Sequence, residues 1–226
     1  MEMPRGRLAA VFASLALLFA ASSVQAQVVI SQVYGGGGNS GATLKNDFIE
    51  LRNNGPTAVD LTGWSVQYTS SAGTSWGSRT PLSGTIPAGG FYLIQQAQGA
   101  GGTVDLPTPD ATGTIAMAGT AGKVALSRST TALTGACPTA DANVVDFVGF
   151  GSAANCFEGS APTGTLINTT AALRGGDGSI DTNNNGADFA VGAPNPRNSG
   201  AEPPEPPDPP LALTIAQIQG NGLLSP

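Results

Sequence analysis

The chain has 226 residues, of which 11% are charged and 32 are glycine, and its formal net charge is −6 at pH 7. It contains no histidine, which excludes Ser-His-Asp and Cys-His catalytic arrangements. The nine Lys and Arg residues are scattered rather than gathered into the basic patch typical of nucleic-acid-binding proteins. We therefore expect a turn-rich β protein that binds no nucleic acid by itself.

The first 26 residues are typical of a signal peptide. Two arginines precede an apolar run at 8–21, and a small-x-small pattern predicts cleavage between Ala26 and Gln27. The apolar run is too short to span a membrane, although an uncleaved anchor is an alternative. The sequence therefore predicts a secreted, extracellular protein with no membrane span.

Cys137 and Cys156 are the only two cysteines. An even number of cysteines in an exported chain favours a disulfide, which would stabilise the fold by roughly 3 kcal/mol through loop-closure entropy. Two cysteines without histidine do not make a zinc site. A pair of buried free thiols is the alternative.

From residue 28 onward, short runs of alternating apolar and polar residues are separated by glycine, proline and asparagine turns. This pattern indicates an all-β fold, an antiparallel β-sandwich whose sheets each expose one face to solvent. The expected strands are 28–34, 47–53, 59–61, 63–68, 91–95, 123–127 and 144–150.

The connections between these strands carry their own expectations. Residues 96–122 should wrap one edge of the sandwich, with a short irregular strand near 114–115. Four glycines at 35–38 lack the Gly-Lys-Ser/Thr of a phosphate-binding loop and predict a flexible loop. Residues 174–196 read as a polar segment that ends the domain. Trp64 is expected in the core, whereas Trp76 fits either a core position or an exposed ligand platform.

Composition divides the chain into four parts. After the signal peptide (1–26), residues 27–200 are expected to form one β-sandwich domain. Residues 201–210 alternate proline with acidic residues and predict an extended linker. Residues 211–226 resume an apolar alternation, which we interpret as the truncated start of a following β domain. We expect 201–226 to lie outside the compact unit.

One segment resembles the first half of a calcium-binding loop. Asp181, Asn183 and Asn185 offer oxygen ligands at alternate positions, and Gly186 follows. The twelfth position is Gly192 rather than the usual bidentate glutamate. A metal-free Asn/Asp/Gly turn is therefore favoured, and calcium is kept as a weak alternative cofactor.

The ordered set of strand sequences resembles the lamin tail domain. The matching segments are 29–34, 47–53, 59–66, 86–94, 123–126 and 144–150. The closing segments 181–189 and 194–198 look like the bacterial secreted branch of that family. The resemblance implies an immunoglobulin-like β-sandwich.

In the secreted branch this domain often precedes nucleases. Residues 214–226 resemble the first strand of the oligonucleotide-binding-type barrel that follows it there, which implies a later catalytic domain of the endonuclease/exonuclease/phosphatase class. Within this chain, Asp47 and Glu50 lie on the expected strand 47–53 and Asp146 on the strand 144–150, and their spacing pairs none of them. The first hypothesis is therefore a non-catalytic binding or spacer module. The alternatives are the N-terminal fragment of a secreted metal-dependent nuclease or phosphoesterase, and a surface adhesion module. The downstream domains of the same parent chain are the expected partners.

Overall fold

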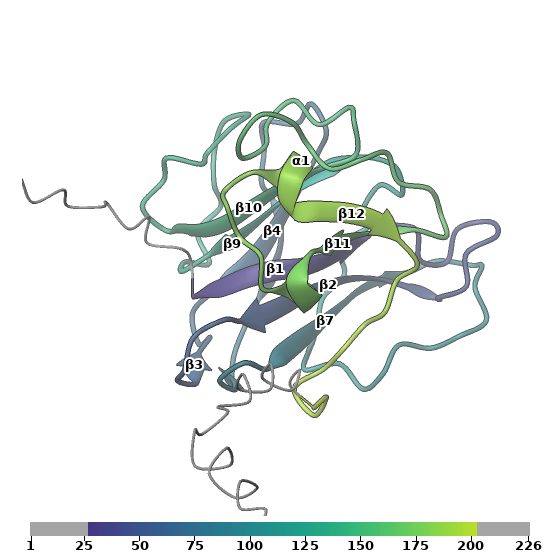
Figure 1. The fold of residues 1–226 in the computed structure, drawn as a ribbon. Helices are drawn as coiled ribbons and strands as arrows, with labels where there is room; N and C mark the ends of the chain where they lie inside the picture. The colour runs from purple at the N-terminus through teal and green to yellow at the C-terminus, as the bar shows by residue number, and fades with distance from the viewer. Residues whose placement is uncertain (1–26, 203–226) are drawn as a thin grey trace, which may run out of the picture.

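The structure, a computed structural model, describes residues 27–202. Two main sheets pack face to face (Figure 1), a six-stranded sheet in the order β12-β11-β1-β2-β7-β8 and a four-stranded sheet in the order β10-β9-β4-β5. Neighbouring strands run antiparallel except β7 and β8, which are parallel. This arrangement is the all-β, immunoglobulin-like antiparallel β-sandwich that the sequence predicts.

Seven of the twelve strands in the described residues lie at the expected alternating runs, and the other five are short strands at positions that the sequence did not predict. The six-stranded sheet contains β1 (Val28–Tyr34), β2 (Asn46–Asn53), β7 (Phe91–Gln98), β8 (Ala111–Thr112), β11 (Ala171–Arg174) and β12 (Phe189–Gly192). The four-stranded sheet contains β4 (Ser65–Ser70), β5 (Ser78–Pro81), β9 (Gly122–Ser127) and β10 (Val144–Phe150). A separate pair is formed by β3 (Val59–Asp60) and β6 (Thr85–Ile86).

The predicted signal peptide and cleavage residue Ala26, and nearly all of the linker and trailing segment, lie outside the described residues. Gln27 is the first described residue and is exposed. No helix within 27–202 is long and apolar enough to cross a membrane.

The main core lies between the two sheets. Alternate residues of β2, such as Ile49 and Leu51, face the four-stranded sheet, from which Val66 and Leu126 point back. These four side chains have no exposed surface. Burial of each side chain of this kind stabilises a fold by about 1.5–3 kcal/mol, so this interface supplies most of the apolar driving force.

The outer face of the six-stranded sheet is also covered, so the prediction of a solvent-exposed face is wrong for β1 and β2. Phe48 points away from the main core and packs on Tyr34, with 5.5 Å between the ring centroids. Leu106, from the connection between β7 and β9, covers them. Ile115, later in the same connection, lies in the main core. The connection therefore wraps the edge of the sandwich and closes its outer face. Its strand β8 precedes the expected position at 114–115.

The outer face of the four-stranded sheet is covered in the same way. Trp76 is 1% exposed and packs on Phe147 and Leu133 beneath the loop that follows β9. Its indole N–H donates to the carbonyl of Gly135 at 3.0 Å. Trp76 is therefore a core residue rather than a ligand platform. Trp64 packs partly buried against the main core, as expected.

The polar segment expected at the end of the domain, 174–196, contains three regular elements, none of which the sequence predicted. A 3-10 turn at Gly176–Gly178 and the short helix α1 (Asn185–Asp188) lead into β12, which pairs with β11. The strand β11 in turn pairs with β1. These pieces are too short to show a periodic pattern, and their pairing with a distant strand decides their structure.

The four glycines at 35–38 are buried and closely packed, so the prediction of a flexible loop is wrong. The Gly37 N–H donates to Asp47 Oδ1 at 2.9 Å, and the Gly38 N–H donates to the Leu44 carbonyl at 2.8 Å. A Cβ atom on Gly37 would lie 1.9 Å from the carbonyl carbon of Asn46. Glycine is required here because the two backbones approach each other closely.

We predict that Gly37→Ala destabilises the protein by about 3 kcal/mol, because the added methyl group overlaps the backbone of β2. Gly77→Ala is the matched control, since the nearest atom to its added Cβ lies 4.0 Å away. Urea unfolding followed by tryptophan fluorescence measures both variants. Equal losses would contradict the close packing of this segment.

Candidate functional site

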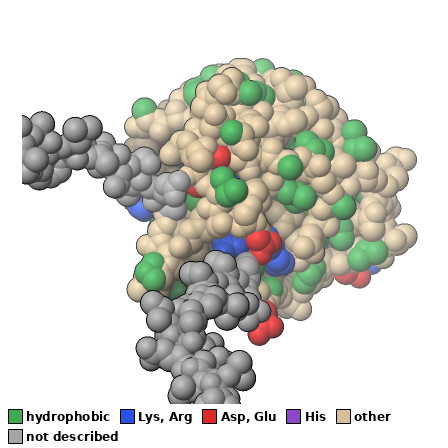
Figure 2. Space-filling model, viewed as in Figure 1, with side chains coloured by type: hydrophobic (Ala, Val, Ile, Leu, Met, Phe, Trp, Pro, Cys, Tyr) green, Lys and Arg blue, Asp and Glu red, His purple; other side chains and the backbone are tan. Residues whose placement is uncertain are grey.

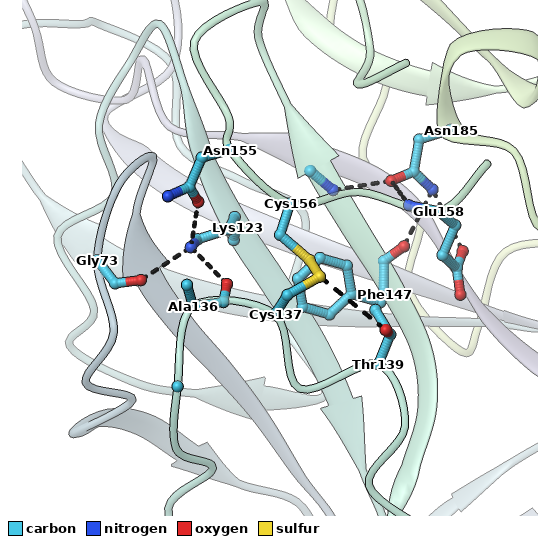
Figure 3. The surroundings of a disulfide bond; sticks show 12 residues. Gly73, Lys123, Ala136, Cys137, Thr139, Phe147, Asn155, Cys156, Glu158 and Asn185 are labelled. Carbon is cyan, nitrogen blue, oxygen red and sulfur yellow. Dashed lines mark hydrogen bonds between the residues drawn. A yellow bond between two sulfur atoms is a disulfide. The ribbon is translucent and has the colours of Figure 1, made fainter. Parts of the chain in front are cut away.

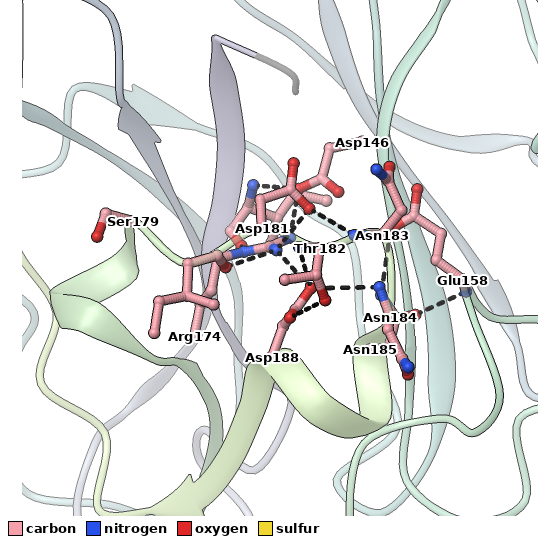
Figure 4. Close-up of polar contacts among 12 residues, drawn as sticks. Asp146, Glu158, Arg174, Ser179, Asp181, Thr182, Asn183, Asn184, Asn185 and Asp188 are labelled. Atoms are coloured by element: carbon pink, nitrogen blue, oxygen red, sulfur yellow. Dashed lines mark hydrogen bonds and ion pairs between the residues drawn. The ribbon is translucent and has the colours of Figure 1, made fainter. Parts of the chain in front are cut away.

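The most concentrated group of charges in the described residues surrounds Arg174, the last residue of β11. Its side chain has no exposed surface. Nη2 lies 2.8 Å from Asp146, and Nη1 lies 3.1 Å from Asp181 and 3.6 Å from Asp188 (Figure 4). A buried guanidinium group requires such partners, because the loss of hydration is otherwise uncompensated. Burial acts to lower the pKa of Arg174, but these three carboxylates raise it overall.

This network joins the two sheets where β1 packs against β10, the edge strand of the four-stranded sheet. The Ile30 N–H donates to Asp146 Oδ2 at 2.6 Å, and Arg174 Nε donates to the Ile30 carbonyl at 2.8 Å. Both strands are irregular at this point, with register shifts next to Ile30 and Asp146. The ion pair of Asp146 and Arg174 therefore supplies hydrogen-bond partners for both the N–H and the carbonyl of Ile30, which lies at a bulge in β1.

The closing segment 181–188 folds around the carboxylates of Asp181 and Asp188. Asp188 accepts hydrogen bonds from the Thr182 N–H at 2.8 Å, the Thr182 hydroxyl at 2.6 Å and the Asn184 N–H at 3.2 Å. Asp181 Oδ1 accepts the Asn183 N–H at 3.2 Å. The acids thus order this turn and attach it to Arg174.

The residues predicted as calcium ligands lie in this segment but have different surroundings. Asp181 pairs with Arg174, and Asn183 adopts a left-handed backbone with φ of 54°. Asn185 Oδ1 accepts the N–H groups of Gly149 at 2.9 Å and Glu158 at 3.1 Å. Asn185 therefore fastens α1 to β10. Calcium binding by Asp181, Asn183 and Asn185 stays a prediction.

A different set of acids lies close together. Carboxyl oxygens of Asp146, Glu158 and Asp181 lie within 4.8 Å of one another. Burial, together with the charges of Asp146 and Asp181, raises the pKa of Glu158 to about 8. Arg174 and a protonated Glu158 therefore limit the negative charge at this point. The sequence gives no sign of this group, because its members come from β10, the following loop and the closing segment.

A second ion pair holds the C-terminal strap, residues 193–202, on the outer face of the six-stranded sheet. Glu50, with no exposed surface, accepts the Ser31 hydroxyl at 2.6 Å and Arg197 Nη2 at 2.8 Å. The Arg197 guanidinium carbon lies 3.7 Å from the ring centroid of Phe91. A small cavity of about 170 Å³ lies beside this pair, lined in part by Asn195.

Asp47 is a third buried acid, and its partners are backbone groups. It accepts the N–H groups of Gly37 and Met117, each at 2.9 Å. Burial raises the pKa of Asp47 to about 7, although these two hydrogen bonds act in the opposite direction. Thus Asp47 and Glu50, both on β2, and Asp146, on β10, form three separate structural contacts.

We predict that Arg174→Met destabilises the protein by about 3–5 kcal/mol, because it leaves buried carboxylates without a positive partner. Lys45→Met is the matched control. Lys45 pairs with Asp105 at 2.9 Å, but Asp105 is 77% exposed, so the loss should stay below about 1 kcal/mol. Urea unfolding gives both values, and a similar small loss for the two variants would show that the network is not important for stability.

We predict that stability falls as the pH rises. Because the pKa of Asp47 is 3.8 in the unfolded chain and about 7 in the folded one, the folded state binds more protons in this interval. Asp47 therefore stabilises the fold fully below pH 4, and this contribution is lost as the pH rises to 7, with a slope of up to about 1.4 kcal/mol per pH unit. Glu158 adds a similar loss up to about pH 8.

Asp47→Asn tests the assignment. The amide NH2 accepts no hydrogen bond, so this variant is less stable than the parent at pH 5, but its stability should change less between pH 5 and pH 8. Urea midpoints at both pH values measure the difference. An unchanged pH dependence in Asp47→Asn would contradict the role of this carboxyl group.

Comparison with known proteins places this arrangement in a family. A crystal structure of a DUF4876 family protein from Bacteroides thetaiotaomicron is similar in fold, with a TM-score of 0.54 and 13% sequence identity over 80% of this chain and 75% of that one. No curated protein matches the chain. The model of the lamin tail domain family matches residues 21–152, which include β1 to β10. The chain therefore belongs to the lamin tail domain family.

Proposed function

We propose that residues 27–200 form a non-catalytic binding or spacer module of an exported protein. The observation that carries this proposal is that the buried charged side chains form contacts within the fold. Each charged side chain that is buried in the described region bonds to the fold itself, namely Asp47, Glu50, Lys123, Asp146, Arg174, Asp181 and Asp188. Membership of the lamin tail domain family, an immunoglobulin-like fold without catalytic activity, supports the same conclusion.

The surface supports a module that does not bind nucleic acid alone. Figure 2 shows one face on which uncharged side chains dominate and charged ones are few. Lys45 pairs with Asp105, and both Arg52 and Arg197 pair with Asp177. Phosphate binding depends on cations that are free to replace counterions, and these arginines and this lysine are already paired. Among the exposed cations of 27–202, Arg79 and Arg128 have no carboxylate partner, and two such cations are too few for a basic groove.

We also propose that the module is exported and that it is part of a longer parent chain. The disulfide between Cys137 and Cys156 is compatible with an oxidising compartment, to which the proposed signal peptide would direct the chain. The second hypothesis, a secreted nuclease parent, is supported by the resemblance of 214–226 to a barrel strand, and these residues lie outside the described part of the chain. In either case, downstream domains would be the partners that the module presents. A full-length protein that carries a catalytic domain would favour the second hypothesis, and one without such a domain would favour the first.

We predict that the purified protein cleaves neither plasmid DNA nor a phosphodiester substrate in the presence of Mg²⁺ or Ca²⁺. The chain contains no histidine, and the acids that are buried within 27–202 are engaged in the fold. We therefore expect neither a buried general base nor a basic groove in this region. Gel electrophoresis and release of nitrophenol measure the two activities. Metal-dependent cleavage that is lost in Asp146→Asn would overturn the proposal, and the Asp105→Asn variant controls for contaminating nucleases.

A further inference from the structure

Lys123, in β9, is a buried cation. The hydrogen-bond acceptors of its ammonium group are two backbone carbonyls and one side-chain amide oxygen, and none is a carboxylate. The Lys123 side chain has no exposed surface. Its Nζ donates to the Gly73 carbonyl at 2.8 Å, the Ala136 carbonyl at 2.7 Å and Asn155 Oδ1 at 2.7 Å (Figure 3). The three ammonium N–H donors thus match three oxygen acceptors from three different loops.

Two of these acceptors lie next to the cysteines in the sequence. Ala136 directly precedes Cys137, and Asn155 directly precedes Cys156. The two cysteines form the disulfide in the structure, with 5.3 Å between their Cα atoms. We propose that Lys123 is a positioning residue for this disulfide, because its ammonium group holds the residues before both cysteines to one point.

Other noncovalent contacts keep the same loops in place. The Gly135 N–H donates to the Thr74 carbonyl at 3.0 Å, and the Asn155 N–H donates to the Ser71 carbonyl at 3.0 Å. The loops that carry Cys137 and Cys156 are therefore both attached to the connection between β4 and β5. This connection also supplies Gly73, the third acceptor of Lys123. The loops need no covalent bond to stay close together, so the reduced protein keeps the two thiols near each other.

The energetic link between Lys123 and the loops is strong because the ammonium group is buried. Each N–H that loses its acceptor in such a place costs more than the same loss in water. Burial also lowers the pKa of Lys123, and the Trp76 ring, with its centroid 5.9 Å from Nζ, offers a further favourable contact. Closing both loops over the ammonium group is therefore favoured before the sulfurs are joined.

The oxidation itself needs an external disulfide, such as oxidised glutathione. One cysteine thiolate attacks that disulfide and releases one glutathione thiolate, which takes up a proton. The second cysteine thiolate then attacks the mixed disulfide and releases the second glutathione. Two protein thiols and one external disulfide thus give one protein disulfide and two external thiols. Lys123 does not react, and it raises the effective concentration of one cysteine toward the other in the second step.

Equilibration of the protein with reduced and oxidised glutathione measures this effective concentration. Asn155→Ala removes one acceptor from the ammonium group, and we expect the effective concentration to fall about tenfold. Asn155→Asp keeps an acceptor and adds a negative charge, so its value should equal or exceed that of the parent. Asn143→Ala is the matched control, since Asn143 lies in the loop before β10 and its side chain contacts Asp141. Its value should stay within about twofold of the parent.

Three outcomes would overturn the proposal. The first is an equal effect of Asn155→Ala and Asn143→Ala. The second is a fall in Asn155→Asp as large as that in Asn155→Ala. The third is a reduced parent protein that loses the near-ultraviolet circular dichroism of its buried aromatics, because its thiols would then not be held by a folded structure. Lys123→Met, if it folds, should show a larger fall than Asn155→Ala.

Discussion

The ion pair between Arg174 and Asp146 is the contact on which the rest of the sandwich depends. It lies where β1 of one sheet meets β10 of the other, and it bonds to both backbone groups of Ile30. A purely apolar contact could bury as much surface, but it would leave these backbone groups without partners. A buried charge pair is costly to form and still more costly to break, so it favours one mutual placement of the sheets over nearby alternatives.

The same chemistry attaches the end of the domain to its beginning. The match to the family model ends at residue 152, yet β11, β12 and the C-terminal strap all follow it. Each of the two main ion pairs has its acid before that point, Asp146 or Glu50, and its arginine after it, Arg174 or Arg197. The part of the chain after residue 152 therefore contributes the arginines that pair with buried acids in the earlier part. These pairs attach the polar segment 174–196, which includes β12, to the six-stranded sheet.

The sequence predicts what depends on local pattern. Alternation located β1, β2 and β10, and the cysteine count predicted the disulfide. Alternation also separated Glu50 from Ile49 and Leu51, as the structure shows. Alternation does not show that the outer faces of the sheets are covered. Whether an outward-facing residue is exposed to solvent depends on a loop or strap that is distant in the sequence.

The failures have one physical cause. Four consecutive glycines read as flexible, but at Gly37 the absence of a side chain allows the backbone of β2 to approach. The polar composition of the closing segment suggests an exposed end, but its acids Asp181 and Asp188 are buried and pair with Arg174. Trp76 lies among small polar residues and is buried by a loop some sixty residues later. In each case the partner is remote, and local composition contains no information on it.

A double-mutant cycle on Asp146 and Arg174 tests the central claim most directly. Asp146→Leu and Arg174→Met each leave a buried charge without its main partner, whereas the double variant removes both members of the pair. Loss of Arg174 from Asp181 and Asp188 is common to Arg174→Met and the double variant, so it cancels in the cycle. The free energies of unfolding of the four proteins give the coupling between the two residues. The account predicts that the double variant loses at least about 2 kcal/mol less than the sum of the single losses. Losses that simply add would show that the two sheets are held together without this pair.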